Sequence, residues 1–474
     1  MNNKKIILTA TAVLSVLSLF ACGNTQSTES SERPQSVQTS ESEKTIDISS
    51  ADESSSAETT ASAVTTVTPE ATEDSSDGYM ETSAAEGPEE EEQEESVQIG
   101  PSDIELLSAE DGNTQLSSGN VTVTIGNKQV DLSGAYVIDG IDAVITGGTY
   151  TSDSSDQNVF LVINGGSLRI QNAEIIKTGD ASASDSKRTS DVSDDYNFYG
   201  MNSVILTVGE GSTAEITDCK ITSECSGANA VFSTAGAEVT VENVSISTSG
   251  NSSRGVYATY GGSIIADRIG ITTQGAHCAP IATDRGGGFV TVTNSTVHCS
   301  GDGSPCIYST GEIIVENVIG ISDGAQAAVI EGKNSITMTG CEFTVNGGNN
   351  GVMLYQSMSG DAADKDATAS FSTLTMSDTS IVNNTEGPMF YVTNTTSVVE
   401  LNGGNTLKSA SGTLVSASAG RWGKDGSNGG TLTLTVSGDS FSDSITADDI
   451  SSVTVELIEG GEFTGTTSGD VTIG

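Results

Sequence analysis

A short motif recurs along the carboxy-terminal three quarters of the sequence at an almost constant spacing. The motif is V-x-[N/D]-x-x-I, in which a small polar residue separates two apolar positions. Its central residue is found at Asn172, Asp218, Asn243, Asp267, Asn294, Asn317, Gly340 and Asp378. From Asp218 to Gly340 the numbering advances by 25, 24, 27, 23 and 23 between successive centres. A nearly fixed period of this length is typical of a solenoid.

The runs between the turn residues are too short to be helices. They are rich in Val, Ile and Thr and are bounded by Gly, Asn, Asp and Ser, which is typical of strands. Repeats of about three strands must stack strand on equivalent strand, ~4.8 Å apart. We therefore predict an all-β fold: a single-stranded right-handed parallel β-helix over residues 113–474, with about 23–27 residues per turn. The central Asn or Asp would take the left-handed conformation of a sharp bend, and stacked Asn side chains would hydrogen-bond along the axis.

The amino-terminal segment, 1–22, has the features of a signal peptide. A positively charged start is followed by a short apolar stretch, IILTATAVLSVLSLFA. The sequence Leu19-Phe20-Ala21-Cys22 resembles the bacterial lipobox, which implies that Cys22 is lipidated and becomes the new amino terminus. An ordinary signal peptide with an unrelated cysteine is the alternative. No other segment is apolar for long enough to span a bilayer, so we expect an extracytoplasmic protein, displayed on the cell surface and anchored to the bacterial membrane by an N-terminal lipid.

Residues 23–112 are composed mainly of Ser, Thr, Glu and Ala and show no hydrophobic period. Such a segment cannot bury enough apolar surface to fold, so we predict a disordered acidic linker. A flexible chain of this length spans about 50 Å on average. The whole chain has 18 Lys and Arg against 64 Asp and Glu, a net charge of −46. We therefore expect no nucleic-acid partner, because nucleic-acid binding needs clustered cations.

The repeat and its asparagine-bearing turn resemble the pectate-lyase-like β-helix superfamily, and more closely the adhesin-like β-helix lipoproteins of bacterial surfaces. The resemblance covers about residues 115–474 and implies the fold much more strongly than an activity, because this fold hosts lyases, hydrolases, adhesins and sugar-binding proteins. In pectate lyases an arginine base works beside carboxylates that hold calcium. Arg254, Arg268 and Arg285 lie on successive repeats here, but no paired carboxylates accompany them. The resemblance therefore does not transfer a catalytic site, and we predict no catalytic residues.

Aligned repeats predict two columns of side chains on one outer face. The aligned segments are AVFST (230–234), GVYAT (255–259), APIAT (279–283), CIYST (306–310), AAVIE (327–331) and GVMLY (351–355). Strand alternation then predicts that the following side chains point outward: Phe232, Tyr257, Ile281 and Tyr308 in one column, and Thr234, Thr259, Thr283 and Thr310 in the other. Exposed aromatic rings beside hydroxyls bind sugar rings. The alternative is that the aromatic rings point inward and fill the core.

Candidate ligand-binding residues lie on this face and in the insertions between repeats. The insertion at 178–203 contains Tyr196, Phe198 and Tyr199, and the loop at 419–430 contains Trp422, which would serve either as a sugar platform or as a cover over the core. The predicted carbohydrate-binding set is Phe232, Tyr257, Tyr260, Tyr308, Arg254, Arg285, Asp284 and Trp422. The run Asp364-Lys365-Asp366 resembles half of a calcium loop, so calcium is left open and no other cofactor is predicted.

Six cysteines follow Cys22, and both histidines precede one of them, at His277-Cys278 and His298-Cys299. Three interpretations are open: buried free thiols, disulfides within short loops such as Cys299–Cys306 and Cys219–Cys225, or a metal site. The spacing typical of zinc ligands is absent, so no metal ligands are assigned.

These observations predict a non-catalytic, lipid-anchored adhesin or carbohydrate-binding protein of the cell surface. We expect its partners to be a polysaccharide or glycan and, through the lipid, the membrane, and we expect a monomer. A polysaccharide lyase or glycoside hydrolase is the first alternative. A structural or protein-binding surface spacer is the second.

Overall fold

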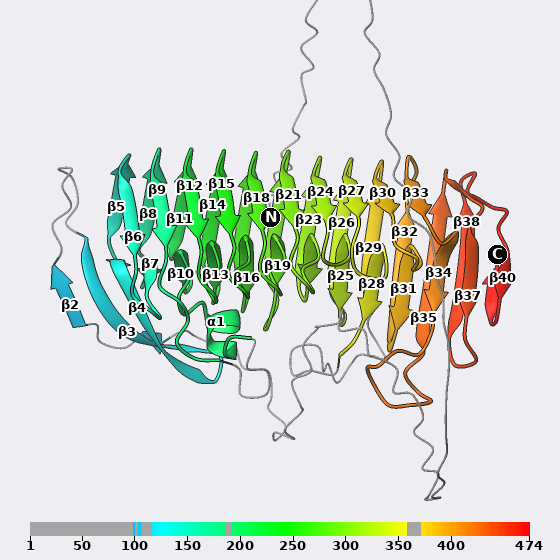
Figure 1. The fold of residues 1–474 in the computed structure, drawn as a ribbon, viewed down its shortest axis with the longest axis horizontal. Coiled ribbons are helices and arrows are strands. Elements are labelled where there is room, and N and C mark those ends of the chain that lie inside the picture. Colours follow the sequence, from blue (N-terminus) through cyan, green and yellow to red (C-terminus); the bar gives the residue numbers. More distant parts are fainter. Residues whose placement is uncertain (1–97, 100–102, 107–115, 185–190, 358–370) are drawn as a thin grey trace, which may run out of the picture. The chain divides into compact units, whose positions relative to one another are not determined.

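The computed structural model describes residues 98–99, 103–106, 116–184, 191–357 and 371–474. The predicted signal peptide with Cys22, and the predicted linker apart from two short strands at its end, lie outside the described residues, as does the run 364–366. Within the described part the chain is all-β apart from one short helix, α1 (Asp194–Tyr199). It coils as a right-handed parallel β-helix (Figure 1), which confirms the predicted fold.

Three parallel sheets form the sides of the solenoid, and each turn contributes one strand to each of them over most of the length. Sheet A contains β1 (Gln98–Ile99), β2 (Asp103–Leu106), β3 (Ser117–Ile125), β4 (Lys128–Asp139), β7 (Asn158–Ile163), β10 (Ile205–Val208), β13 (Val231–Thr234), β16 (Val256–Thr259), β19 (Ile281–Thr283), β22 (Ile307–Ser309), β25 (Ala328–Glu331), β28 (Val352–Tyr355), β31 (Phe390–Thr393), β34 (Thr413–Ala417), β37 (Ser444–Ala447) and β40 (Thr467–Ser468). Its first three strands, β1 to β3, run antiparallel to their neighbours, and β4 begins the parallel stack.

Sheets B and C are parallel throughout. Sheet B contains β5 (Asp142–Thr146), β8 (Ser167–Gln171), β11 (Thr213–Thr217), β14 (Glu238–Glu242), β17 (Gly262–Asp267), β20 (Gly288–Thr293), β23 (Glu312–Glu316), β26 (Ser335–Thr339), β29 (Ser372–Ser377), β32 (Thr395–Leu401), β35 (Gly430–Ser437), β38 (Ser452–Ile458) and β41 (Val471–Ile473). Sheet C contains β6 (Thr149–Ser152), β9 (Glu174–Lys177), β12 (Lys220–Ser223), β15 (Ser245–Thr248), β18 (Gly270–Thr273), β21 (Thr296–Cys299), β24 (Ile319–Ser322), β27 (Glu342–Val345), β30 (Ser380–Asn383) and β33 (Thr406–Ser409). The short strands β36 (Ser440–Phe441) and β39 (Glu462–Phe463) pair with each other.

The bend between sheets B and C is built as predicted, with one correction. Its central residue has a left-handed backbone in successive turns, as at Asn243 (φ 54°), Asn294 (φ 50°) and Asn317 (φ 54°). In the turn between the first two, this residue is Arg268 (φ 53°) and not Asp267, because Asp267 is still paired with Glu242 in sheet B. With Arg268 in place of Asp267 as the central residue, the spacings to Asn243 and Asn294 become 25 and 26 residues instead of 24 and 27. The bend therefore recurs more regularly than the motif indicated.

Polar side chains of this bend bond along the solenoid axis, which confirms the predicted ladder. The Asn317 amide donates to the Asn294 side-chain oxygen at 3.2 Å, and the Asn294 amide donates to the Asp267 carboxylate at 2.7 Å. The Asn243 amide donates to Asp218 on the preceding turn. These bonds join successive turns outside the sheets.

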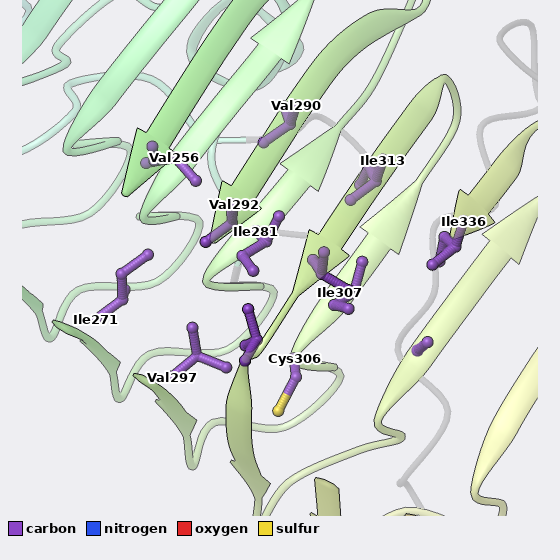
Figure 2. Close-up of a cluster of buried hydrophobic side chains, with 14 of the residues drawn as sticks. Val256, Ile271, Ile281, Val290, Val292, Val297, Cys306, Ile307, Ile313 and Ile336 are labelled. Atoms are coloured by element: carbon purple, nitrogen blue, oxygen red, sulfur yellow. The ribbon is translucent and has the colours of Figure 1, made fainter. Parts of the chain in front are cut away.

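The interior is a continuous apolar core that runs from Leu116 to Val455. Inward residues of the three sheets stack in columns; Val256, Ile281 and Ile307 from sheet A meet the inward side chains of sheets B and C (Figure 2). Because the inside is filled by aliphatic side chains, a ligand can be bound only on the outer faces.

Candidate functional site

The outer face of sheet A carries two columns of side chains. The first column passes through Phe232, Tyr257, Ala282, Tyr308 and Val329, which are paired in register on consecutive strands. The second column includes Thr234 and Thr259, and further along it Glu331, Tyr355 and Thr393. Thr283 pairs with Ala258 and Ser309 pairs with Ile330. The next residues, Asp284 and Thr310, therefore lie in the second column between Thr259 and Glu331.

The alignment of the third repeat is wrong by one residue. Ile281 pairs with Val256 and Ile307 and points into the core, so Ala282 and not Ile281 occupies the outer column (Figure 2). For the same reason Thr283 is not in the threonine column, and Asp284 takes that position. The repeat from Val256 to Ile281 is one residue longer than the alignment assumed, and a shift of one residue moves a strand's side chains to the other face.

The aromatic column points away from the core, but the predicted exposure is wrong. Phe232 and Tyr257 are both fully buried, in an edge-to-face contact with ring centroids 4.7 Å apart. They belong to a second apolar cluster, which forms between the outer face of sheet A, the β3–β4 hairpin and α1. A flat face of exposed aromatic rings is therefore absent at these two positions.

Helix α1 forms part of this cover because of its own sequence. Ser193 caps its amino end by accepting a hydrogen bond from the Asp195 N–H, and Gly200 ends it in a left-handed conformation (φ 74°). Phe198 is buried, and the Arg285 guanidinium lies 4.0 Å from its ring centroid. Tyr199 stacks on Tyr260 at 5.6 Å. Tyr260 and Arg285 therefore hold the cover in place rather than facing a free surface.

A second cover lies further along sheet A, where Trp422 is buried against Tyr355 with ring centroids 4.6 Å apart. The Asn428 amide holds this loop by donating to the carbonyls of Gly420 at 2.7 Å and Trp422 at 2.9 Å. Trp422 thus packs over the outer face. Tyr308 borders both apolar clusters and lies between the two covers.

Between the two covers the outer face opens into a small recess, which we call the sheet A recess. It is lined by Arg254, His277, Ala279, Asp284, Gly303, Pro305 and Tyr308. Its volume is about 30 Å³, so it can hold a small polar group but not a whole sugar ring. Arg254, Asp284 and Tyr308 belong to the predicted binding set, and Tyr257 lies directly behind them.

Arg254 and Asp284 form the charged part of the recess. The Arg254 guanidinium lies 4.6 Å from the Tyr257 ring centroid, donates to the Asn197 side-chain oxygen at 2.9 Å, and has Nη2 4.0 Å from the Asp284 carboxylate. The Tyr257 hydroxyl donates to the same carboxylate at 2.9 Å. Both charged groups are almost completely buried. Their positions are fixed by hydrogen bonds to Asn197 on α1 and Tyr257 on β16.

Glu331 lies next to the recess and is 3% exposed. Its carboxylate accepts hydrogen bonds from the hydroxyls of Tyr355, at 2.6 Å, Tyr308 and Ser357. Burial raises the pKa of Glu331, although the three donors oppose that shift. Burial and the neighbouring Glu331 charge likewise raise the pKa of Tyr308. The phenol of Tyr308 is therefore held as a proton donor toward Glu331.

Thr310 occupies the column position between Asp284 and Glu331. Its side chain is 4% exposed, and its hydroxyl makes no hydrogen bond to any residue that the structure describes. A buried hydroxyl without a partner loses free energy relative to water. Thr310 lies beneath the surface beside Asp284, and it is not among the residues that line the sheet A recess.

Glu331, which lies beside this site, was not predicted, whereas Thr310 was predicted to lie in the outer column of hydroxyls. The aligned repeats contained a signal for Glu331, since AAVIE places a carboxylate in a column of threonines. Arg268, by contrast, is far from the recess; it pairs with Glu242 and Asp267 at the bend between sheets B and C.

The six cysteines are buried free thiols in this structure. Cys219 and Cys225 lie at opposite ends of β12 as free thiols, so the structure shows the first of the three interpretations and not a short-loop disulfide between them. The Sγ atoms of Cys299 and Cys306 are 3.7 Å apart inside the core. Among the described residues, no group of three or more His, Cys, Asp and Glu side chains could hold a metal ion.

No helix in the described ranges has the length and hydropathy of a membrane span. The chain matches no family model, and neither a curated protein nor a solved structure is significantly similar to it.

Proposed function

We propose that this chain is a non-catalytic, lipid-anchored surface protein that binds carbohydrate at the sheet A recess. The observation that carries the proposal is the buried Arg254–Asp284 pair in the wall of the recess, which Asn197 and Tyr257 hold in place. The recess is small and takes a polar group rather than a whole sugar ring. A sugar offers many hydroxyls, each able to donate and accept, and so could bond to Arg254 and Asp284 together.

The surroundings of the recess support the same ligand class. Tyr308 is half-buried at its edge, so part of its ring can contact the apolar face of a sugar. Arg254 and Asp284 are held by protein partners before any ligand arrives, so binding would require little reordering of side chains. The predicted mechanism is therefore local insertion of one hydroxyl, in place of stacking along an exposed aromatic column.

A glycan array probed with the purified full chain tests this proposal. Asp284→Asn removes the charged acceptor and keeps the shape of the side chain, so it should weaken the best glycan signal about tenfold, the worth of one hydrogen bond to a charged group of ~1.5 kcal/mol. Asp439→Asn is the matched control, because Asp439 is also a buried, hydrogen-bonded carboxylate but is not among the residues that line the recess.

The control variant should bind like the original protein. Equal losses in the two variants would contradict binding at the recess. No signal from any glycan would favour the surface-spacer alternative instead.

Cleavage of a polysaccharide is a second candidate, favoured by the placement of Asp284 and Glu331 two turns apart in one column. Two turns correspond to about 9.6 Å between backbones, near the upper end of the ~6.5–9.5 Å carboxyl separation of inverting glycosidases. This candidate ranks second because both oxygens of Glu331 already accept hydroxyl hydrogen bonds and the group is buried. New reducing ends that disappear in Glu331→Gln would support it.

A further inference from the structure

A second and much larger depression lies on another side of the solenoid, at the bend between sheets B and C. We call it the B–C groove. It has a volume of about 720 Å³ and is lined by residues of five successive turns, from Gly148 to Gly270. Five turns stacked ~4.8 Å apart give a groove about 19 Å long that follows the solenoid axis. None of the predicted binding residues lies in it.

The groove has two polar walls. Ala173, Cys219 and Val244 lie between them, and their side chains belong to the core and are almost completely buried. One wall is the column of left-handed residues Asn172, Asp218, Asn243 and Arg268. The other wall is the first residue of each sheet C strand, in register: Glu174, Lys220, Ser245 and Gly270. A ligand lying along the axis would therefore meet one residue of each wall at each of four successive turns, although the residue types differ from turn to turn.

The charges of the groove are compensated within the protein. Lys220 pairs with Glu174 at 2.8 Å, and Arg268 pairs with Glu242 and Asp267. The lining holds two acidic and two basic side chains, although the whole chain has a net charge of −46. This balance favours a neutral ligand, since a polyanion would find no unpaired cation in the lining and would be repelled by the rest of the chain.

The backbone of the groove is not available to an extended peptide. The N–H groups of Lys220, Ser245 and Gly270 donate to carbonyls of the preceding turn at 2.9–3.0 Å, along the axis. Strand addition, which is the usual way to bind an extended peptide, needs free backbone groups. Recognition in the groove must therefore use polar side chains such as the amides of Asn172 and Asn243 and the hydroxyl of Ser245, which suit the hydroxyl-rich edges of a chain of sugar rings.

We propose that the B–C groove binds a neutral, linear polysaccharide lengthwise, one segment of the polymer above each turn. This site rests on the proposed carbohydrate-binding function but is separate from the sheet A recess. The recess takes one hydroxyl, so its affinity should not depend on the length of the ligand. The groove adds contacts with every sugar until it is filled, so its affinity should rise with length.

The test is calorimetry of the full chain with neutral β-1,4-linked gluco-, manno- and xylo-oligosaccharides of increasing length. For the oligosaccharide class that binds, affinity should rise roughly two- to tenfold with each added sugar until the groove is filled, the effect of one further hydrogen bond. Ser245→Trp places a large side chain on the groove wall and should abolish this rise. Ser380→Trp is the matched control, since Ser380 lies further along the same column, outside the groove.

Gly270→Tyr is a second blocking variant should Ser245→Trp fail to fold. A Cβ at Gly270 would meet only the Thr296 hydroxyl, at 3.6 Å, so the position has room for a side chain. A length dependence that survives both blocking variants, or affinity independent of length, would overturn the groove and leave the recess intact. No binding by any oligosaccharide would overturn the groove, and the glycan array then decides the recess separately.

Discussion

At the scale of single residues, the site depends on buried polar groups whose partners come from distant parts of the chain. Strand alternation predicted correctly that Tyr257 and Tyr308 point away from the core. It could not predict that Phe198 and Tyr199, which belong to a much earlier insertion, cover Tyr257 and Tyr260. Burial of an outer face depends on where an insertion folds back, and this is not encoded in the repeat itself.

Glu331 should make the stability of the protein depend on pH. Its pKa is raised in the folded protein, so its contribution to the free energy of unfolding is complete below the ordinary glutamate pKa and is lost as the pH rises through the raised value. Glu331→Gln cannot ionise. The free energy of unfolding of this variant should therefore rise relative to that of the original protein from about pH 4 upward. The total rise should be ~1.4 kcal/mol for each unit by which the folded protein raises the pKa of Glu331.

Urea unfolding at a series of pH values measures this difference. Glu312→Gln is the control, because Glu312 lies exposed on the outside of sheet B. A difference between Glu331→Gln and the original protein that stays constant with pH, or that shrinks as the pH rises, would show that the folded protein does not raise the pKa of Glu331.

At the scale of secondary-structure elements, the turn from sheet C to sheet A depends on a column of glycines. A Cβ at Gly275 would lie 2.0 Å from the Gly250 carbonyl oxygen, one at Gly301 would lie 1.8 Å from that of Gly275, and one at Gly324 would lie 1.9 Å from that of Gly301. Successive turns thus touch through their backbones at this point. Each glycine therefore marks the same position in its own turn.

The spacing of these glycines matches that of the left-handed residues from Asn243 to Asn317, since each glycine follows the left-handed residue of its turn at the same interval. An alignment anchored on the glycines would therefore have placed Arg268 at the bend and Asp284 in the outer column. The V-x-[N/D]-x-x-I motif failed there because it required Asn or Asp at a position that arginine occupies. The β3–β4 hairpin and α1, in contrast, fall outside the period, so the repeat carried no information about the face that they cover.

Gly301→Ala should destabilise the protein by about 2–3 kcal/mol, because the new methyl group would overlap backbone atoms that cannot move independently. Gly270→Ala is the matched comparison, because a Cβ at this position has room. Alanine loses less conformational entropy than glycine in a strand, so the free energy of unfolding of this variant should increase by about 0.5–1 kcal/mol. Thermal or urea unfolding of both variants measures the contrast. Equal stabilities would mean that the glycine turns do not set the spacing between successive turns.

At the scale of the whole molecule, the period of the sequence was sufficient to predict a stack of parallel turns. It was sufficient because every turn buries the same kinds of side chain against its neighbours, so the inward columns run without a break through one core. Its outer faces differ from turn to turn, and that is where the recess and the groove lie. The proposed recess therefore lies beside departures from the repeat, such as Asp284 and Glu331 in a column of threonines.

The predicted lipid at Cys22 would place this solenoid at a membrane. Two acyl chains on one residue are enough for stable anchoring, whereas a single chain gives only reversible binding. Mass spectrometry of the mature protein from bacterial membranes should therefore find Cys22 as the first residue, carrying the mass of at least two acyl chains. Cys22→Ala should lose that mass and the resistance of the protein to extraction by high salt, while glycan binding by the solenoid should not change. A mature chain that begins elsewhere, or a Cys22 without lipid, would contradict the anchor and leave the solenoid unattached to the membrane by this route.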